Sequence, residues 1–292
     1  MNPYQIAVMS GKGGAGKTSF TAAFVKLFPK VVAVDADVNA SNLPILLPPE
    51  RMSETDYYGM DVARIDTKLC SGCGQCATIC AFYAIKPSAN ETFVVNEECE
   101  GCAACAWVCP ENAVSLVPHV SGRKYVSRIA NGFMAHADLI PGEDNSGKLI
   151  SSIREDARTL ALTEDVPSIV IDGPPGTSCQ AISSLTGVQM VIVVLEESLS
   201  GLSDYRRLAQ LLESFRLPHW VVINKGGLDP GLATRVQQAV AEWDGEIVGR
   251  VPFDPQIPLS LSRRETLLDL PVYRPLVEAV YRRIPIQAEP VR

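Results

Sequence analysis

The feature that most constrains this chain is a glycine-rich loop that lies between a predicted strand and a predicted helix near the N-terminus. The run Tyr4–Met9 has the apolar character of a buried strand, and Gly11–Thr18 follows it almost directly. Apolar residues after the loop recur at helical spacing, and a second apolar run, Val31–Asp35, comes next. A strand, a helix and a second strand in this order predict a βαβ unit, which requires a parallel sheet with a right-handed crossover.

The same alternation continues through the C-terminal part of the chain. Apolar runs predict strands, and amphipathic runs between them predict helices. The predicted strands are 168–172, 188–195, 220–224 and 247–251, and the predicted helices are 148–162, 203–215 and 232–243. Asn145 and Ser146 are predicted to cap the first of these helices. The sequence therefore predicts an α/β fold in which a mostly parallel sheet is flanked by helices.

The charge balance and the apolar runs exclude several classes of protein. The chain has 26 basic and 33 acidic residues and a net charge of −7, which argues against a protein that coats nucleic acid. Its longest apolar run, Val188–Leu195, is too short to span a bilayer. The first residues do not have the pattern of a secretory signal. We therefore expect a cytoplasmic protein that has neither nucleic acid nor membrane as a partner.

The last predicted helix, Val272–Ile284, carries an apolar stripe made of Val272, Leu276, Val280 and Ile284. Such a stripe is compatible with a helix that lies on a membrane surface. It is also typical of a terminal helix that packs on its own sheet, and we prefer this interpretation because any surface helix shows such a stripe.

Eight of the nine cysteines lie in two copies of one pattern, C-x2-C-x2-C-x3-C, offset by 29 residues. Clustered thiols in a chain without a secretory signal are typical of metal ligands rather than of a disulfide scaffold. The first copy comprises Cys70, Cys73, Cys76 and Cys80, and the second comprises Cys99, Cys102, Cys105 and Cys109.

This spacing matches that of bacterial two-cluster ferredoxins, in which the fourth cysteine of each run binds the other cluster. We therefore expect two [4Fe–4S] clusters. Zinc is the competing metal, because paired C-x2-C motifs also bind it, but the doubled spacing favours iron and sulfur. Ala81 stands where the pattern has a proline, so the surroundings of the second cluster are expected to differ. The predicted ligand sets are Cys70, Cys73, Cys76 and Cys109 for one cluster, and Cys99, Cys102, Cys105 and Cys80 for the other.

The glycine-rich loop itself fits the pattern G-x-x-x-x-G-K-[ST], which is typical of phosphate-binding loops. Glycines let successive backbone N–H groups converge on a phosphate, and the helix that follows adds the positive end of its dipole. Lys17 is expected to reach the β- and γ-phosphates, and the Thr18 hydroxyl is expected to bind Mg²⁺. The predicted nucleotide-binding residues of the loop are Gly11, Gly13, Gly14, Ala15, Gly16, Lys17, Thr18 and Ser19.

An additional lysine, Lys12, gives the loop the sequence G-K-G-G-A-G-K-T, a deviant Walker A motif. In this motif the chain resembles the MinD/ParA/Mrp-type ATPases, which are relatives of the nitrogenase iron protein. The resemblance implies that Lys12 reaches across a face-to-face dimer to the partner's nucleotide, and that ATP drives this dimerisation. It covers nearly the whole chain on both sides of the cysteine-rich segment.

Acidic residues at the ends of predicted strands extend the candidate site. Asp172 ends an apolar run, at the edge where open α/β sheets bind ligands, and it is expected to hold Mg²⁺. Glycine follows it, so the catalytic base must come from elsewhere, and Asp37 is the candidate. The resemblance places Asp37 in a first switch segment and 173–177 at the start of a second. The alternative is that Asp35 or Asp37 only caps a loop.

Three further residues are assigned by the resemblance. It implies that Asn224 and Pro252 hold the adenine. The nitrogenase iron protein has a cluster-binding cysteine at a place comparable to Cys179, but it needs a second cysteine from another loop. The corresponding stretch here, 141–148, contains none, so Cys179 is interpreted as a buried or free thiol.

Together the two motifs resemble MinD-superfamily ATPases that contain an inserted ferredoxin domain. The predicted P-loop ATPase domain comprises 1–64 and 118–292, and the predicted two-cluster α+β ferredoxin domain comprises 65–117. From the resemblance we expect a slowly hydrolysing Mg·ATPase that forms homodimers. Our first hypothesis is that it couples its nucleotide state to electron transfer to a partner protein. The alternative is a maturation or assembly ATPase whose clusters are structural or supply reducing power.

Overall fold

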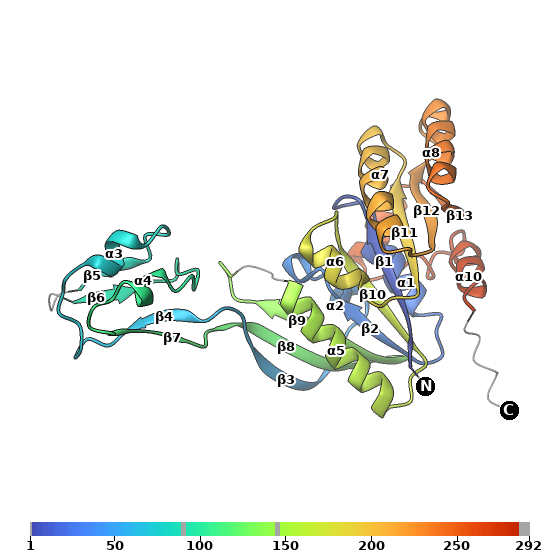
Figure 1. Ribbon diagram of the computed structural model, residues 1–292. Helices are drawn as coiled ribbons and strands as arrows, with labels where there is room; N and C mark the ends of the chain where they lie inside the picture. Colours follow the sequence, from blue (N-terminus) through green and yellow to red (C-terminus); the bar gives the residue numbers. More distant parts are fainter. Residues whose placement is uncertain (1, 89–91, 144–146, 286–292) are drawn as a thin grey trace. The chain divides into compact units, whose positions relative to one another are not determined.

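The computed structural model describes residues 2–88, 92–143 and 147–285 (Figure 1). The chain forms two compact units: a host unit of residues 1–55 and 124–292, and a cysteine unit of residues 56–123. The predicted insertion, 65–117, falls inside the cysteine unit, which also contains a strand ahead of the first cysteine. The predicted helix cap at Asn145 and Ser146 lies outside the described residues.

A nine-stranded sheet forms the centre of the host unit. Its strands are β1 (Tyr4–Ser10), β2 (Val31–Asp35), β3 (Glu50–Tyr58), β8 (Val120–Ile129), β9 (Gly132–Leu139), β10 (Ser168–Pro175), β11 (Met190–Glu196), β12 (His219–Gly226) and β13 (Glu246–Pro252). Their order is β13-β12-β11-β1-β10-β2-β9-β8-β3. Every pair from β13 to β9 is parallel, which confirms the predicted mostly parallel sheet. The apolar pattern does not indicate β8 or β9, because their residues mix polar with apolar side chains.

Helices cover both faces of this sheet. They are α1 (Lys17–Val25), α2 (Leu43–Leu46), α5 (Gly147–Thr163), α6 (Cys179–Leu185), α7 (Leu199–Ser214), α8 (Pro230–Glu242), α9 (Gln256–Ser262) and α10 (Arg274–Arg282), with a short 3-10 turn η1 (Val38–Ala40). The helices α5 to α8 cover one face, and α1 and α10 cover the other (Figure 1). The predicted helices are present with ends that differ by a few residues. Helix α7 starts earlier than predicted because the Ser198 hydroxyl accepts a hydrogen bond from Gly201 N.

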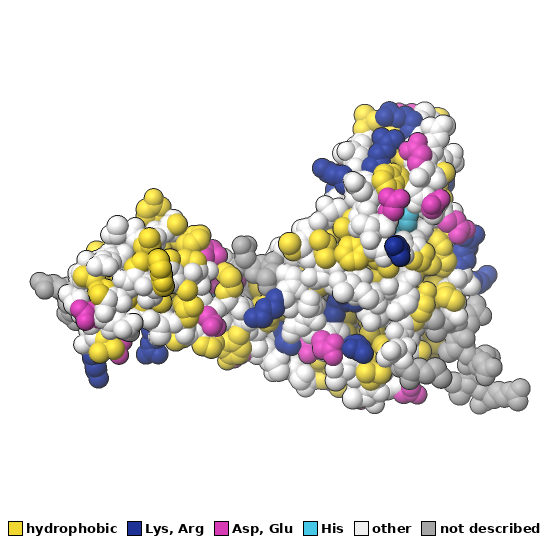
Figure 2. Space-filling view, viewed as in Figure 1, with side chains coloured by type: hydrophobic (Ala, Val, Ile, Leu, Met, Phe, Trp, Pro, Cys, Tyr) yellow, Lys and Arg dark blue, Asp and Glu magenta, His cyan; other side chains and the backbone are white. Residues whose placement is uncertain are grey.

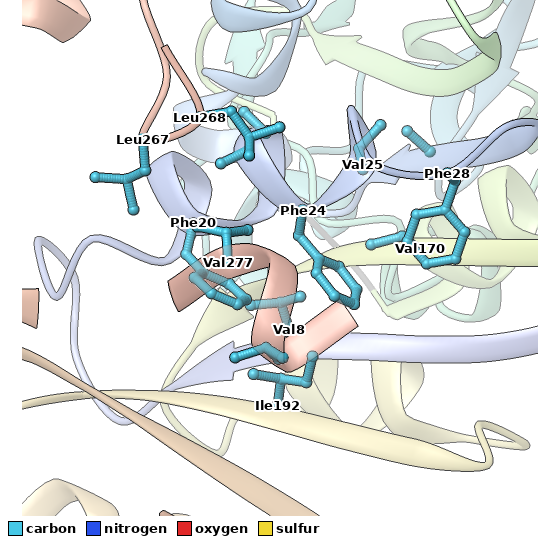
Figure 3. Packing of buried hydrophobic residues seen from close by; sticks show 14 of the residues in the cluster. Val8, Phe20, Phe24, Val25, Phe28, Val170, Ile192, Leu267, Leu268 and Val277 are labelled. Carbon is cyan, nitrogen blue, oxygen red and sulfur yellow. The ribbon is translucent and has the colours of Figure 1, made fainter. Parts of the chain in front are cut away.

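The main core lies between α1, the sheet and α10. Phe20 and Phe24 of α1 pack against Val8 and Ile192 of the sheet (Figure 3). The two phenylalanine rings stack with their centroids 5.6 Å apart. Burying a phenylalanine side chain contributes about 1.5–3 kcal/mol. This packing holds α1, and with it the loop that ends at Lys17, against the end of β1.

The terminal helix α10 packs on its own sheet, as preferred from the sequence. Val277 and Val280 are fully buried, and Ile284 is nearly so. Val272, which belongs to the predicted stripe, is instead 80% exposed because the helix begins only at Arg274. Among the described residues, no helix is both long and apolar enough to cross a membrane.

The cysteine unit consists of two short helices and two pairs of antiparallel strands. The helices are α3 (Gln75–Ile79) and α4 (Ala104–Trp107); β4 (Val62–Ile65) pairs with β7 (Val114–Val117), and β5 (Ile85–Pro87) pairs with β6 (Phe93–Val95). Among its described residues, the hydrophobic cluster of this unit is small and consists of Ala63, Cys76, Ile85, Cys105 and Val114. Two of these five side chains are thiols.

The internal repeat that the sequence predicts also appears in the backbone. Residues with a positive φ occur in pairs that are 29 positions apart, so both copies make the same left-handed turns. The paired residues are Gly72 and Gly101, Gly74 and Ala103, and Tyr83 and Asn112. Helix α3 in the first copy likewise corresponds to α4 in the second.

Candidate functional site

A cavity of about 800 Å³ opens in the host unit at the carboxyl ends of the parallel strands. The glycine-rich loop, the turn after β2 and the segment after β13 line it. Its polar lining includes the predicted residues Gly13, Gly14, Gly16, Lys17, Thr18, Ser19, Asp37 and Asn224, and Pro252 also borders it. This is the edge at which open α/β sheets bind their ligands.

Two residues of the predicted loop set, Gly11 and Ala15, do not line this cavity. At Gly11 a Cβ atom would lie 2.5 Å from the Cβ atom of Asp204, so the close approach of α7 requires glycine. Ala15 is buried, and its carbonyl oxygen accepts a hydrogen bond of 2.7 Å from Asn224 Nδ2. These two residues shape the loop rather than face the space inside it.

Asp172 was predicted to end a strand, but β10 continues to Pro175. Asp172 is fully buried and binds three side chains from α1. Lys17 Nζ lies 3.1 Å from Asp172 Oδ1. The hydroxyl of Thr18 donates to Asp172 Oδ2 at 2.7 Å, and the hydroxyl of Thr21 donates to Asp172 Oδ1 at 2.7 Å. The motif does not include Thr21, although its position four residues after Lys17 places both on one helix face.

Lys17 is nearly buried and lies between two carboxylates. Its Nζ atom is 3.6 Å from Asp37 Oδ2, in addition to the contact with Asp172. Burial by itself lowers the pKa of Lys17, but the charges of Asp172 and Asp37 raise it, and the net pKa lies above the usual value. The amine therefore stays protonated and can pair with a phosphate.

The two aspartates after β2 have different surroundings. Asp35 is fully buried, and its Oδ2 atom accepts hydrogen bonds from Ser41 Oγ at 3.0 Å and from Leu43 N at 3.1 Å. Burial and the nearby Asp172 carboxylate raise the pKa of Asp35 to about 7. Asp37 is only partly buried and borders the cavity. Asp35 thus holds the loop, and Asp37 is the carboxylate that faces the space where a ligand can bind.

Lys12 lies outside the cavity lining and is held within its own chain. Its Nζ atom lies 2.6 Å from Glu196 Oε1, and it donates to Ser198 Oγ at 3.2 Å and to Ser200 Oγ at 2.9 Å. Glu196 ends β11, and both serines lie at the start of α7 or just before it. This set of contacts is not predicted from the motif.

Glu196 also binds a second lysine that touches the loop. Lys225 Nζ lies 2.8 Å from Glu196 Oε2 and donates to the Gly14 carbonyl oxygen at 2.8 Å. Burial raises the pKa of Glu196, but hydrogen bonds from Lys12, Lys225 and Ser198 outweigh it and lower the pKa to about 2. The sequence contains one signal for Glu196: it directly follows the predicted strand 188–195, at the edge where open α/β sheets bind ligands.

Asn224 fixes the shape of the loop from the end region of β12. A Cβ atom at Gly16 would lie 2.2 Å from Asn224 Nδ2, and the φ of Gly16 is +91°, so only glycine fits there. Residues 173–175, which were expected to begin a switch segment, are the last residues of β10 instead. Helix α6 starts only at Cys179.

Two smaller cavities lie in the cysteine unit, and each is lined by four thiols. The Cys70 cavity is lined by Cys70, Cys73, Cys76 and Cys109, and the Cys99 cavity is lined by Cys80, Cys99, Cys102 and Cys105. In each cavity the fourth thiol comes from the other copy of the repeat. Within residues 2–88, 92–143 and 147–285, no three His, Cys, Asp or Glu side chains converge as they would on a single metal ion.

All nine cysteines are free thiols. Cys76 and Cys105 are buried, and burial raises the pKa of both. Cys73 and Cys102, which occupy equivalent positions in the repeat, are exposed. Cys179 is exposed at the start of α6 and borders neither thiol cavity.

Comparisons with known proteins agree with the α/β fold of the host unit. The model of the CobQ/CobB/MinD/ParA nucleotide-binding domain matches residues 6–267. An uncharacterised protein of Methanocaldococcus jannaschii is 31% identical over 269 residues, which are 91% of this chain and 90% of that protein.

Solved structures show the same fold. The septum site-determining protein MinD of Pyrococcus horikoshii, complexed with Mg-ADP, has a TM-score of 0.56 at 17% identity over 95% of this chain and 94% of that one. Apo McdA of Cyanothece has a TM-score of 0.57 at 16% identity, with 96% and 98% covered. At these identities the likeness concerns the fold alone.

Proposed function

The chain belongs to the CobQ/CobB/MinD/ParA family of nucleotide-binding domains, and from this membership and the geometry of the cavity we propose that it binds Mg·ATP and hydrolyses it slowly. The observation that carries the proposal is the grouping of Lys17, Thr18 and Asp172 beside the glycine-rich loop. A charged amine, a hydroxyl and a carboxylate in this arrangement are the side chains that a P-loop uses for phosphate and metal.

The side chains beside the loop fit a magnesium ion. Thr18 Oγ1 and Asp172 Oδ2 lie 2.7 Å apart, and both are oxygen ligands of the kind that Mg²⁺ prefers. Thr18 and Asp172 would hold the ion, which neutralises phosphate charge when it is bound. The loop's backbone N–H groups and Lys17 would bind the phosphates.

Other residues that border the cavity can contact the adenine and the attacking water. Asn224 and Pro252 border the cavity at the ends of β12 and β13, where they can contact the adenine. Burial raises the pKa of Asp37, and although the neighbouring Lys17 lowers it, the net pKa stays above the usual value. A carboxylate with a raised pKa is a better proton acceptor, so Asp37 is the proposed group that orients and deprotonates water.

ATP is proposed to join two copies of the chain, with Lys12 at their interface. Lys12 is bound to Glu196 of its own chain. To reach a nucleotide in the partner, Lys12 must leave the Glu196 carboxylate and pair with phosphate oxygens instead. The Glu196 side chain is 17% exposed. Glu196 then keeps its second lysine, Lys225, so the carboxylate is not left unpaired.

The thiol cavities are proposed to bind two [4Fe–4S] clusters. Four thiols surround each cavity, in the sets that a two-cluster ferredoxin requires. A zinc ion draws its ligands to one point, whereas each iron of a four-iron cluster binds its own thiolate, so the ligands surround the cluster. The small core of the cysteine unit supports this proposal, because units below about 70–80 residues generally need a metal or a disulfide for stability.

The clusters are proposed to carry electrons to a partner protein, under control of the nucleotide. The cysteine unit exposes large apolar side chains, among them Trp107 at 89% and Tyr83 at 74% exposure. Apolar side chains also gather on the face of this unit in Figure 2. Such exposed apolar patches are typical of protein interaction sites. In the alternative, maturation or assembly, the same clusters are structural or supply reducing power.

Removing the Thr18 hydroxyl should weaken binding of Mg·ATP but not of ATP without the metal. We expect Thr18→Ala to lower the affinity for Mg·ATP about tenfold, or by about 1.4 kcal/mol, in isothermal titration calorimetry. Thr234→Ala, on the exposed side of α8, is the matched control. Equal affinities for Thr18→Ala and the unaltered protein would contradict the magnesium site.

Asp37→Asn should keep the affinity for Mg·ATP and lower the rate of ATP hydrolysis by about 10²–10⁴.

Removing the Lys12 amine should separate nucleotide binding from dimerisation. We expect Lys12→Ala to bind Mg·ATP as the unaltered protein does, because Lys12 does not border the cavity, but to stay monomeric with ATP. Size-exclusion chromatography with light scattering measures the mass. Lys30→Ala, an exposed lysine, should still form the dimer. An ATP-dependent dimer of Lys12→Ala would refute this role.

The cysteine unit should contain eight irons and eight sulfides per chain after anaerobic reconstitution, since each of two clusters contributes four of each. Cys73→Ser and Cys102→Ser should each disturb one cluster in iron analysis and in electron paramagnetic resonance (EPR). Cys179→Ser is the control, because Cys179 is equally exposed but borders no thiol cavity. Zinc in place of iron, or loss of both clusters in Cys179→Ser, would count against the ligand sets.

Nucleotide should change the reduction potential of the clusters if the protein is an ATP-gated electron donor. An anaerobic EPR titration with ADP, and then with a non-hydrolysable ATP analogue, measures both potentials. A change of about 59 mV corresponds to a tenfold change in the ratio of oxidised to reduced cluster. Potentials that are the same with both nucleotides would favour the maturation or assembly function.

A further inference from the structure

The two thiol cavities receive equivalent hydrogen bonds from the backbone. In the Cys99 cavity, Ala84 N donates to Cys80 Sγ at 3.3 Å. In the Cys70 cavity, Ala113 N donates to Cys109 Sγ at 3.3 Å. These two bonds are related by the repeat of 29 residues, so they affect both cavities alike.

A third hydrogen bond breaks this symmetry. Ala63 N donates to Cys99 Sγ at 3.4 Å. Cys70 is the repeat equivalent of Cys99, and in the described part of the chain no backbone N–H donates to its sulfur atom. The backbone hydrogen bonds at Cys76 and at Cys105 are repeat equivalents too, so among the described residues the Cys99 cavity receives one backbone N–H group more than the Cys70 cavity.

The acidic side chains at the two cavities do not offset this difference. Glu100 borders the Cys99 cavity, and Glu111 borders the Cys70 cavity. Among the described residues, one carboxylate thus lines each cavity. The additional N–H group of Ala63 remains as an electrostatic difference between the two sites.

From this asymmetry we propose that Ala63 raises the reduction potential at the Cys99 cavity, so that the first electron taken up from a one-electron reductant rests there. The inference depends on the proposed binding of two clusters. Reduction adds one negative charge to a cluster, and an N–H dipole that points at a ligand sulfur stabilises the more negative state. The site with the additional dipole therefore accepts an electron at the higher potential.

The N–H group of Ala63 can be removed with little damage to the strand. Ala63 lies opposite Leu116 in the two-stranded β4–β7 pair, and its N–H points at Cys99 instead of at β7. Proline is tolerated in a strand where its nitrogen does not face the ladder. Ala63→Pro removes the donor, and Ala63→Gly is the matched control that keeps it.

The test is an anaerobic EPR redox titration of the reconstituted full-length protein with dithionite. We expect two one-electron waves in the unaltered protein. Ala63→Pro should lower the potential of the upper wave by about 59 mV, which corresponds to a tenfold change in the ratio of oxidised to reduced cluster. It should leave the potential of the lower wave unchanged. Ala63→Gly should leave the potentials of both waves unchanged. A shift of the lower wave, or of neither, would overturn the proposal.

A second pair of variants tests the same assignment without altering β4. Cys102 belongs to the Cys99 cavity, and Cys73 is its exposed equivalent in the Cys70 cavity. Cys102→Ser should change the EPR signal that appears first on reduction, and Cys73→Ser should change the one that appears second. The reverse assignment, or two equal potentials, would overturn the proposal.

Iron and sulfide analysis keeps this outcome separate from that of the cluster proposal. A reconstituted chain without iron and sulfide refutes both the binding of clusters and the role of Ala63. A chain with two clusters whose potentials are equal or reversed refutes only the role of Ala63.

Discussion

The buried carboxylate of Asp172 is the group on which the proposed nucleotide site of the host unit depends. Removing a carboxylate and an amine from water is costly unless they are paired and hydrogen-bonded, and Asp172 meets this condition with Lys17, Thr18 and Thr21. The three partners follow each other along α1, so the carboxylate fixes that helix against β10. The aromatic packing of α1 on the sheet also holds this helix in place. The glycine-rich loop lies between β1 and α1, so both of its ends are fixed.

The cysteine unit is held by a different kind of interaction. In the part of this unit that the structure describes, the hydrophobic cluster contains five buried side chains, two of which are thiols. The cysteines of the two copies meet at shared cavities. So small an apolar core supplies little stabilisation, and the proposed clusters would connect the two copies because each binds a thiol from the other. In this view stability and electron transfer depend on the same eight residues.

Local patterns predicted much of this structure. The glycine-rich loop, the strand–helix–strand order and the 29-residue repeat follow from spacing alone, since each is made of residues near one another in the chain. Strands β8 and β9 were not indicated, because their mixed side chains lack a clear period. Lys12 and Glu196 are 184 positions apart, and no local pattern connects them.

The amino-acid sequence by itself determined which chemical groups are present and how they are grouped: a P-loop with a second lysine, and two runs of four cysteines. Only the tertiary structure decided which of two neighbouring aspartates faces the cavity, because Asp35 and Asp37 differ in burial and not in residue type. It also decided that Lys12 is held by Glu196, and that Ala63 makes two otherwise equivalent thiol cavities unequal. Each of these depends on which distant strands lie side by side, and therefore on the order of strands in the sheets.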